Sequence, residues 1–518
     1  MKCKRRVLVA AIHAVTFLVF TLSPAISLAN EDAQPDAPFD LVLSGGRVID
    51  PASGFDAVRH VGLRGGQIAA ISTTPLGKAT RTIDASGLVV APGFIDLHTH
   101  SATPLGQRYQ LLDGVTTALE LEAGAYPIDR FGDALSEGAR IHYGASAGFG
   151  SIRLEAMLGI RQPHLLGSKP KPVSLRGYWT ALQALFTGAP TSFFSDPTSK
   201  RQQAKMKAMF EAALDEGALG VGVPLDYFSE GVREDELRMI FEVAAARDVL
   251  LFIHVRRGIN GDPAGLREAI ALAESTGAAV HICHIQHNAM RNIALFLREI
   301  REARARGVDI STESLPYNAG SAAIMSAVFG RDWRTIFAID YGDVELAATG
   351  ERFTKESFER TRRENPTAQV VHHYVKDEWT REALLEPGVM VVSDLLPMTD
   401  RSKMVAPHNG AFSRVLGRYA RDAGLMTLPE ALAKMTSMPA DRLAAFHPRF
   451  ARKGRVQVGA DADLTLFDAA TILDRADYGD PFQGSAGIHT VIVGGQIALD
   501  AFQLVEDTFA GQNLNQAE

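Results

Sequence analysis

Short apolar runs separated by amphipathic stretches dominate the middle of the chain. Eight runs have the length and composition of buried strands: 89–100, 116–122, 142–148, 219–223, 249–255, 278–285, 308–314 and 389–394. Apolar residues recur at helical spacing in several of the intervening stretches: 203–216, 234–247, 263–276 and 293–306. Strands that alternate with amphipathic helices indicate a parallel sheet with helical crossovers. We therefore predict an α/β fold with a (β/α)8 TIM-like barrel over residues 89–443.

The two ends of the chain follow a different pattern. Residues 39–88 and 444–500 contain short strands joined by tight turns, with Gly45-Gly46 and Gly65-Gly66 as turn signals. Neither end is long enough to build a comfortable core alone. We expect both ends to pair into one small β-sandwich domain, with the barrel inserted between them. Residues 163–200 and 330–386 read as insertions into the barrel, and residues 501–518 as a tail.

The first 29 residues have the three parts of a bacterial secretory signal peptide. Lys2, Lys4, Arg5 and Arg6 precede an apolar run at 7–22, and Ser27 and Ala29 offer a cleavage site. The alternative is an uncleaved anchor, although the run is shorter than the ~20 residues that span a bilayer. Residues 30–38 are polar and read as a flexible leader. The sequence thus predicts an exported, periplasmic protein.

Composition and charge narrow the choice of partners. The chain has 518 residues, of which 46% are hydrophobic and 22% charged, as in ordinary globular proteins. Loss of the signal peptide would change the formal net charge from −7 to −11, which disfavours nucleic acid and anionic membrane surfaces. We expect a small-molecule substrate and no stable membrane insertion after cleavage, and leave a homo-oligomer open. Cys283 would be the single cysteine, so no internal disulfide is expected.

Metal-ligand residues stand at or near the ends of five predicted strands. They are His98 and His100, Glu120 and Glu122, His254, His284, and Asp394. In a barrel, the carboxyl ends of the strands meet at one mouth. One His-x-His pair is near chance level among 15 histidines in 518 residues, but five strands ending this way are not. Imidazoles and carboxylates at one mouth indicate a zinc site, with another divalent metal as the alternative.

Strand alternation makes a further prediction for the sixth run. If His284 faces inward, His281 and Cys283 face the helix layer and are structural, with Cys283 acting as a small buried hydrophobe.

Several of these stretches resemble the amidohydrolase superfamily, and within it the N-acyl-D-amino-acid deacylase (D-aminoacylase) group. The similarity rests on Pro92-Gly-Phe-Ile-Asp-x-His-x-His100, on the histidines that end the fifth and sixth strands, and on Ser393-Asp394. Further similar stretches are 217–222, 254–256, 316–321, 410–417, 434–440 and 461–468. The resemblance covers about 40–495 and implies a metal-dependent barrel that hydrolyses linear amides.

The sequence departs from that group at three places. The group usually has a bridging cysteine after strand two, where this chain has Ala123, so Glu122 is our candidate bridging ligand and Glu120 the second choice. Its lysine two residues after the sixth-strand histidine is Gln286, and its Pro-Arg is Pro407-His408-Asn409. A carboxylate bridge is a harder ligand than a thiolate and favours a two-metal site.

The resemblance implies a set of roles for individual residues. His98, His100, Glu122, His254 and His284 would hold one or two zinc ions, and Asp394 would act as general base and then acid. The substrate would be an N-acyl-D-amino acid, with N-acyl-D-glutamate one candidate. Candidates for substrate binding are Arg256, which would pair with a carboxylate, Tyr317, Gln286 and Tyr227. The pair His372-His373 has no assigned role.

Two other functions stay open. One is a dipeptidase or cyclic-amide hydrolase on the same scaffold, although 219–224 lacks the lysine that a hydantoinase usually has in its fourth strand. The other is a non-catalytic periplasmic binding protein on a decayed scaffold, against which the intact set of histidines argues.

Overall fold

The computed structural model describes residues 38–187, 192–401 and 408–516. The predicted signal peptide, all of the predicted leader but its last residue, and Pro407 lie outside these residues. Within the described part of the chain, no helix is long and apolar enough to cross a bilayer.

Eight parallel strands form the barrel, which confirms the predicted fold class. In sheet order they are β19 (Val389–Val391), β14 (Ile310–Ser314), β13 (Val280–Ile282), β12 (Leu251–Ile253), β11 (Val221–Val223), β8 (His142–Gly148), β7 (Val115–Ala125) and β6 (Phe94–Asp96). Residues just beyond the two end strands meet in a bridge between Thr99 and Leu395. The bridge joins the first and last strands at the mouth.

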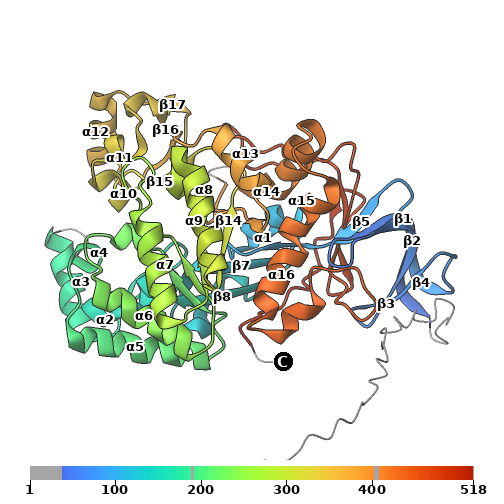
Figure 1. The fold of residues 1–518 in the computed structure, drawn as a ribbon, viewed down its shortest axis with the longest axis horizontal. Helices are drawn as coiled ribbons and strands as arrows, with labels where there is room; N and C mark the ends of the chain where they lie inside the picture. Colours follow the sequence, from blue (N-terminus) through green and yellow to red (C-terminus); the bar gives the residue numbers. More distant parts are fainter. Residues whose placement is uncertain (1–37, 188–191, 402–407, 517–518) are drawn as a thin grey trace, which may run out of the picture.

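Helices, most of them amphipathic, cover the outside of the barrel (Figure 1). They are α2 (Phe149–Leu158), α5 (Lys200–Asp215), α6 (Glu234–Ala246), α7 (Ala264–Thr276), α9 (Ile293–Ala305), α13 (Asp377–Leu385), α15 (Leu428–Met435) and α16 (Ser437–Ala444). Further helices are α1 (Pro104–Leu111), α8 (Ile285–Ala289) and α14 (Ala411–Arg414), the last continuing into a π-helix at Val415–Asp422. Val280 and Ile282 of β13 share a buried core with Ala269 of α7 and Phe296 of α9. Such contacts bury the apolar stripes that the sequence shows.

The predicted strand at 89–100 is two strands in two different sheets. Val89–Pro92 (β5) pairs with the end domain, whereas β6 belongs to the barrel. Gly93 lies between them, and a Cβ at this position would come within 2.2 Å of the Thr116 side chain. Only glycine fits there, so the chain passes from one sheet to the other at this residue.

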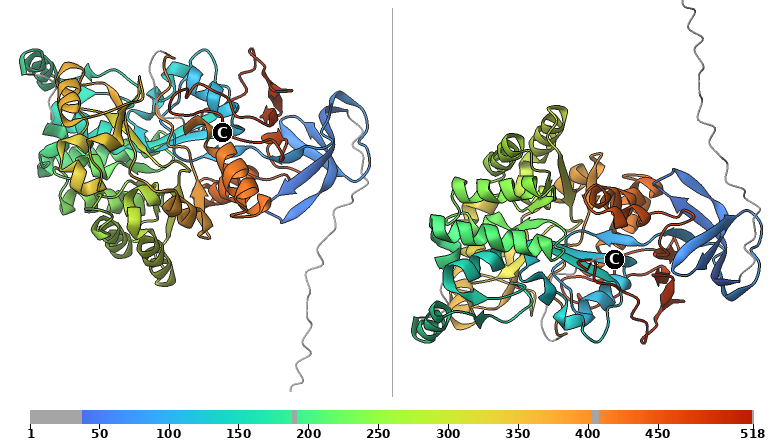
Figure 2. Two further views of the ribbon diagram at one scale, coloured as in Figure 1. Left: turned by 90° about the horizontal axis from the view of Figure 1, so that it is seen from above. Right: turned by 90° about the horizontal axis from the view of Figure 1, so that it is seen from below.

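Both chain ends build one nine-stranded sheet. Its strands are β1 (Phe39–Asp50), β2 (Phe55–Arg64), β3 (Gln67–Ser72), β4 (Ala79–Asp84), β5, β20 (Leu464–Phe467), β21 (Ile488–Val493), β22 (Gln496–Asp500) and β23 (Gln503–Leu504). Strand β5 joins the halves, since it pairs with β1 on one side and β20 on the other. Figures 1 and 2 show β1–β4 projecting at the end of the molecule opposite to α3, α4 and α10–α12.

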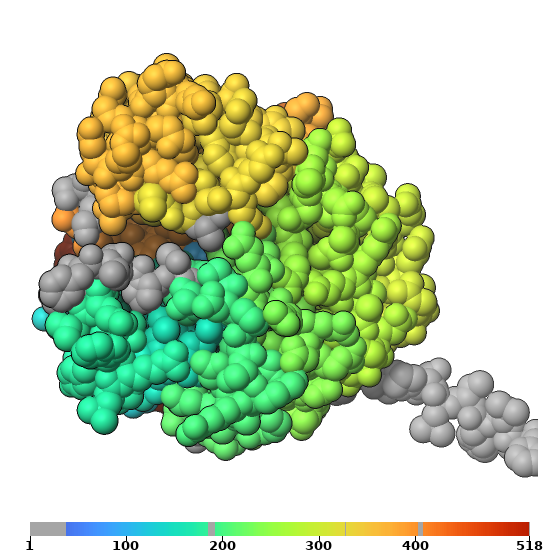
Figure 3. All heavy atoms as spheres, turned by 90° about the vertical axis from the view of Figure 1, so that its left-hand side faces the viewer, coloured from blue at the N-terminus to red at the C-terminus, as the bar shows by residue number. Residues whose placement is uncertain are grey.

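Two insertions stand at that opposite end. The first contains β9 (Ile160–Arg161), β10 (Lys171–Pro172), α3 (Leu175–Thr187) and α4 (Ser192–Ser195). The second, which we call the lobe, spans 320–373. It contains β15 (Gly320–Ala323), α10 (Ala327–Gly330), α11 (Trp333–Phe337), β16 (Val344–Leu346), β17 (Glu351–Arg352), α12 (Lys355–Glu364) and β18 (Gln369–His372). The lobe has its own four-stranded sheet and apolar core. Figure 3 shows a hollow between the lobe and the first insertion.

Candidate metal centre

Four histidines and two carboxylates converge just beyond the carboxyl ends of the barrel strands. His98 and His100 follow β6, Glu122 lies in β7, His254 follows β12, His284 follows β13 and Asp394 follows β19. The side chains of the histidines and Glu122 are 1–6% exposed, and that of Asp394 is 23% exposed. The sequence predicted all six, and the structure brings all six together.

Glu122 lies between two pairs of histidines. One carboxylate oxygen, Oε1, is 3.1 Å from both His254 Nδ1 and His284 Nε2. The other oxygen, Oε2, is 3.5 Å from both His98 Nε2 and His100 Nε2. Each oxygen therefore faces one pair. This is the arrangement by which a carboxylate bridges two metal ions, and it favours Glu122 over Glu120 as the bridge.

The nitrogen and oxygen atoms that face the middle of this cluster are placed to bind metal ions rather than to hydrogen-bond to one another. His98 Nε2 and His254 Nδ1 are buried and have no hydrogen-bond partner among the described residues. The ligand atoms of His98, His100 and Glu122 lie within 4.8 Å of one another, as do those of Glu122, His254 and His284. A buried polar atom without a partner is costly unless a ligand satisfies it. Two positions for a metal that share Glu122 would satisfy these atoms with histidine and carboxylate ligands.

Asp394 completes the first position. Its Oδ1 lies 3.2 Å from His100 Nε2 and 3.5 Å from His98 Nε2. Its backbone is held by a hydrogen bond from its N–H to the His98 carbonyl, and its own carbonyl lies 3.0 Å from His408 Nδ1. Asp394 has φ 51° and His284 has φ 31°, which non-glycine residues rarely adopt. Such strained residues cluster at functional sites, where the surrounding structure holds them in place.

A buried carboxylate that the sequence reasoning missed holds His98 from behind. Glu313 of β14 lies 2.5 Å from His98 Nδ1 and 2.9 Å from His281 Nε2. Burial alone would raise the pKa of Glu313, but the positive charges of these histidines lower it to about 2. An ionised Glu313 fixes the proton on His98 Nδ1 and leaves Nε2 free for a metal. The sequence signal that could have pointed to Glu313 is an acidic residue near the end of the predicted buried strand at 308–314.

Glu120 plays the same part for His100. Its carboxylate lies 2.8 Å from His100 Nδ1 and 2.6 Å from His164 Nε2. His164 belongs to the first insertion, and no sequence signal distinguished it from other loop histidines. The second-choice bridging residue is therefore an outer partner of His100, through which the insertion reaches the centre.

The prediction that His281 and Cys283 face the helix layer is wrong. His281 bonds to Glu313, and Cys283 lies in one cluster with His98 and Glu313, so both face the centre. Val280 and Ile282 instead pack against the helices. Alternation breaks because β13 ends at Ile282 and His284 turns inward through its left-handed backbone.

The Arg256 side chain has partners within the protein, so its predicted contact with substrate stays a prediction. Its guanidinium donates to Glu268 Oε2 at 2.8 Å and to the carbonyls of Ser229 and Val232 at 2.6 and 2.7 Å. These hydrogen bonds tie the Arg256 side chain to the protein itself. Strand β12 ends at Ile253, so Arg256 lies beyond the strand and its side-chain direction does not follow from the strand. The next residue, Arg257, approaches the centre instead, with its Nη2 3.3 Å from His254 Nε2.

Two of the other candidates lie against residues of the centre. Tyr227 meets the His254 ring edge-on, with the ring centroids 5.4 Å apart. Tyr317 stacks on His408 at 4.7 Å, and its buried hydroxyl has no hydrogen-bond partner among the described residues. Gln286 is fully buried and its amide donates to the Leu315 carbonyl, so its predicted contact with substrate stays a prediction.

The two neighbouring histidines of the lobe differ in environment. His372 is buried and stacks on Tyr374, with the ring centroids 5.1 Å apart. Tyr374 in turn lies 2.7 Å from Nδ1 of His287, which follows β13. His373 turns the other way, 3.3 Å from Glu345. His372 thus belongs to the wall of the mouth and His373 to the lobe's own ion pairs.

A TIM-like barrel with paired histidines and a bridging carboxylate at the carboxyl ends of its strands defines the class of metal-dependent barrel hydrolases. The sequence comparison makes the assignment specific. Residues 89–498 match the Amidohydrolase family, and the chain belongs to that family. This confirms the resemblance predicted from its motifs.

Individual relatives agree with the family. The chain is 32% identical to N-acyl-D-glutamate deacylase of Alcaligenes xylosoxydans xylosoxydans, over 88% of this chain and 93% of that one. The crystal structure of N-acyl-D-glutamate deacylase from Bordetella bronchiseptica, complexed with zinc and a phosphonate mimic of the tetrahedral intermediate, superimposes with a TM-score of 0.75. It is 26% identical and covers 93% of this chain and 100% of its own. A D-aminoacylase structure, described by its binuclear metal centre, has a TM-score of 0.74 and 25% identity, with 92% and 100% covered.

Proposed function

We propose that this protein is a zinc-dependent deacylase that hydrolyses N-acyl-D-amino acids to a carboxylate and a free amino acid. The observation that carries the proposal is the position of Glu122, with one oxygen toward each pair of histidines. Support also comes from the relatives, which are named as deacylases of this kind.

Each metal position would draw on its own ligands. His98, His100, Glu122 and Asp394 would hold one ion, and Glu122, His254 and His284 the other. Burial and the charge of His284 lower the pKa of His254 to about 4, so its imidazole is neutral and able to ligate. Bound zinc would polarise the amide carbonyl and lower the pKa of a water molecule.

Asp394 would move the proton. Burial would raise the pKa of its carboxyl group, but His98 and His100 outweigh burial and hold it well below its usual range. Asp394 therefore starts the reaction as a carboxylate that can accept a proton from the attacking water. Its strained backbone aims it across the centre, from where it can return the proton to the departing amine nitrogen.

A hydrolysis screen tests the proposal. Purified protein with added zinc is offered N-acetyl derivatives of D- and L-amino acids, a set of dipeptides, and hydantoin. We expect hydrolysis of the N-acetyl-D-amino acids, with metal analysis showing at least one zinc per chain. Activity on dipeptides or hydantoin alone would replace the proposal with one of the two other hydrolase functions. No activity together with less than ~0.5 zinc per chain would favour a decayed binding protein.

We further propose that the chain is exported and loses residues 1–29. The basic residues, the apolar run and the small residues at the cleavage site support this proposal. In a bacterial host, the mature protein should be found in the periplasmic fraction and begin at Asn30. An intact N-terminus in the membrane fraction would contradict it.

A further inference from the structure

Arg257 is a buried cation whose hydrogen-bonding groups are largely unused. Its side chain is 5% exposed, and its Nε has no partner among the described residues. The guanidinium makes one contact at hydrogen-bond distance, 3.3 Å from Nη2 to His254 Nε2. The rest of it lies over the rings of Phe337 and Tyr374, at 4.9 and 5.5 Å. A buried guanidinium with unpaired donors is costly unless an anion binds it.

The nearest carboxylate, that of Asp226, does not neutralise Arg257. Asp226 is fully buried and accepts two hydrogen bonds from Arg331, at 2.9 and 3.0 Å. It lies 3.8 Å from Arg257 Nη1, beyond hydrogen-bond distance. One negative charge thus faces two positive ones, and the group as a whole carries a net charge of about +1, since arginine stays protonated in proteins.

The contact with His254 would also be lost in the working protein. If His254 binds zinc through Nδ1, the atom that faces Glu122, then Nε2 carries the proton. Nε2 becomes a donor and can no longer accept from Arg257. The acceptor atom of a carboxylate that lies on this side of the ring is Asp226 Oδ2, 3.7 Å from His254 Nε2. Loading the centre therefore leaves Arg257 without an acceptor while it stays beside the reacting groups.

We infer that Arg257 binds the free carboxylate of the amino-acid half of the substrate. This inference rests on the proposed function and adds the residue that selects an acid over a neutral amide. A guanidinium binds a carboxylate through two parallel hydrogen bonds, and the aromatic rings beside it exclude water and strengthen them. Asp226 and Arg331 hold the backbone of Arg257 and the lobe in place. The Arg257 backbone N–H donates to Asp226 Oδ1 at 3.0 Å, and Arg331, which belongs to the lobe, donates to the same carboxylate.

Two variants of neighbouring arginines separate this role from a structural one. Arg257→Met removes the proposed anchor. Arg256→Met is the matched control, because the Arg256 guanidinium is hydrogen-bonded to Glu268 and two backbone carbonyls. The first measurement is turnover of the best N-acetyl amino acid and of its carboxamide. We expect Arg257→Met to raise KM for the acid by about 10- to 100-fold, with KM for the carboxamide unchanged. Arg256→Met should keep the preference for the acid.

The second measurement is binding without turnover. Zinc-loaded protein is titrated with 4-oxopentanoate, in which a CH2 group replaces the amide nitrogen of N-acetylglycine, and with 4-oxopentanamide. Wild type and Arg256→Met should bind the acid at least about tenfold more tightly than the amide, and Arg257→Met should bind both equally. This preference can exist even in a protein that hydrolyses no N-acyl amino acid, so failure of the proposed function is distinguishable from failure of the inference.

Retention of the full preference by Arg257→Met overturns the inference, as does a wild type without any preference. Metal content and melting temperature show whether the variant is intact. If Arg257→Met does not fold, Arg257→Lys decides: it keeps the charge but loses the two-pronged geometry, so it should lower the preference by part of the expected factor. An unchanged preference in Arg257→Lys, with zinc retained, counts against the inference.

Discussion

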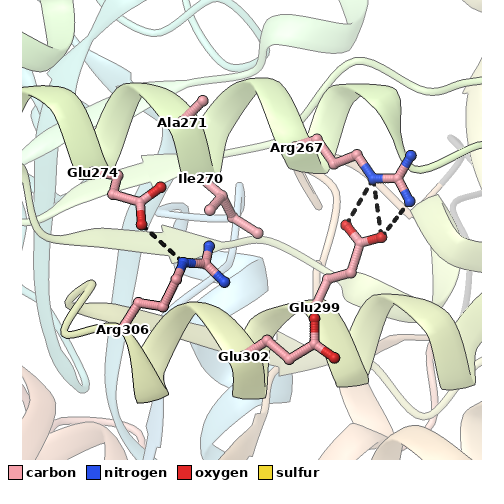
Figure 4. Close-up of a pocket in the computed structure, with 7 residues that line it drawn as sticks. All are labelled: Arg267, Ile270, Ala271, Glu274, Glu299, Glu302 and Arg306. Atoms are coloured by element: carbon pink, nitrogen blue, oxygen red, sulfur yellow. Dashed lines mark hydrogen bonds and ion pairs between the residues drawn. The ribbon is translucent and has the colours of Figure 1, made fainter.

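Two regions of the barrel each bring ionisable side chains of opposite charge close together, and they differ in how far those side chains are buried. On the outer surface, ion pairs join α7 and α9, between Arg267 and Glu299 at 2.5 Å and between Arg306 and Glu274 at 2.8 Å (Figure 4). Arg267 is 60% exposed and Arg306 is 49% exposed. At the mouth, the four histidines and Glu122 of the candidate centre are almost fully buried, and Asp394 is 23% exposed.

The difference lies in what each charge can find as a partner. On the surface, Arg267 and Arg306 each have an acid beside them, water screens both charges, and a pair contributes little to stability. At the mouth, Glu313 and Glu120 stand behind His98 and His100, yet His98 Nε2 and His254 Nδ1 point inward without a partner among the described residues. Charge alone therefore does not mark a functional site. Buried donors that converge without satisfying one another do.

The largest effect is expected at Asp394. In Asp394→Asn, the amide cannot accept the proton that water must lose, so kcat should fall by about 100- to 10,000-fold. The activity is measured with saturating zinc, and metal analysis confirms that the centre is filled. Unchanged kcat in the filled variant would show that another group moves the proton.

The next effect is the loss of metal in Glu122→Gln. An amide has one oxygen to offer where the carboxylate offers two, so it cannot face both histidine pairs. Zinc bound per chain should fall by about half or more after dialysis. Glu120→Gln is the control for the bridge: it alters the partner of His100 but leaves both Glu122 oxygens in place, so it should lose less zinc than Glu122→Gln does. Equal losses in the two variants would make Glu120 as good a bridge.

A smaller effect is expected from the carboxylate behind His98. Glu313→Gln keeps the shape but loses the charge that orients His98, and partners of this kind typically change metal affinity by about 10- to 100-fold. Competition with a chelator measures that affinity. Glu236→Gln is the matched control, because Glu236 is equally buried but pairs with Arg153, away from the centre. If both variants bind zinc like wild type, Glu313 is only a packing residue.

The smallest effect should come from the surface pairs. Arg267→Ala removes an exposed ion pair, so the free energy of unfolding should change by about 0–1 kcal/mol and activity not at all. Chemical denaturation at low and high salt measures the change, and most of it should vanish at high salt. A loss above about 2 kcal/mol would mean that burial is not what separates the two regions.

Much of the barrel and of the metal ligands could be predicted because each depends on local order in the chain. Apolar runs of strand length end in ligand residues, and parallel strands in a barrel bring those ends together whatever the details of the loops. His98, His100, Glu122, His254, His284 and Asp394 follow from that rule. The residue that only holds a ligand in place, such as Glu313, carries no such signature. Its partner is 215 residues away along the chain.

The errors occurred where the chain leaves regular structure. Alternation along a strand misplaced His281 and Cys283, because it was counted from His284, which lies two residues beyond the end of β13 at Ile282. Beyond a strand end, one left-handed residue such as His284 redirects every side chain near it. The pattern of apolar and polar residues along the chain does not predict this change of backbone direction.

The sequence by itself determined the type of fold, the chemical types of the ligands and the order in which the strands supply them. Periodicity and composition depend on neighbours along the chain, so they can be read there. The tertiary structure alone decided which oxygen of Glu122 faces which histidines, that Glu120 and Glu313 stand behind His100 and His98, and that Arg257 rather than Arg256 approaches the centre. These facts depend on distances between segments far apart in the chain and on side-chain directions at strand ends, which packing sets.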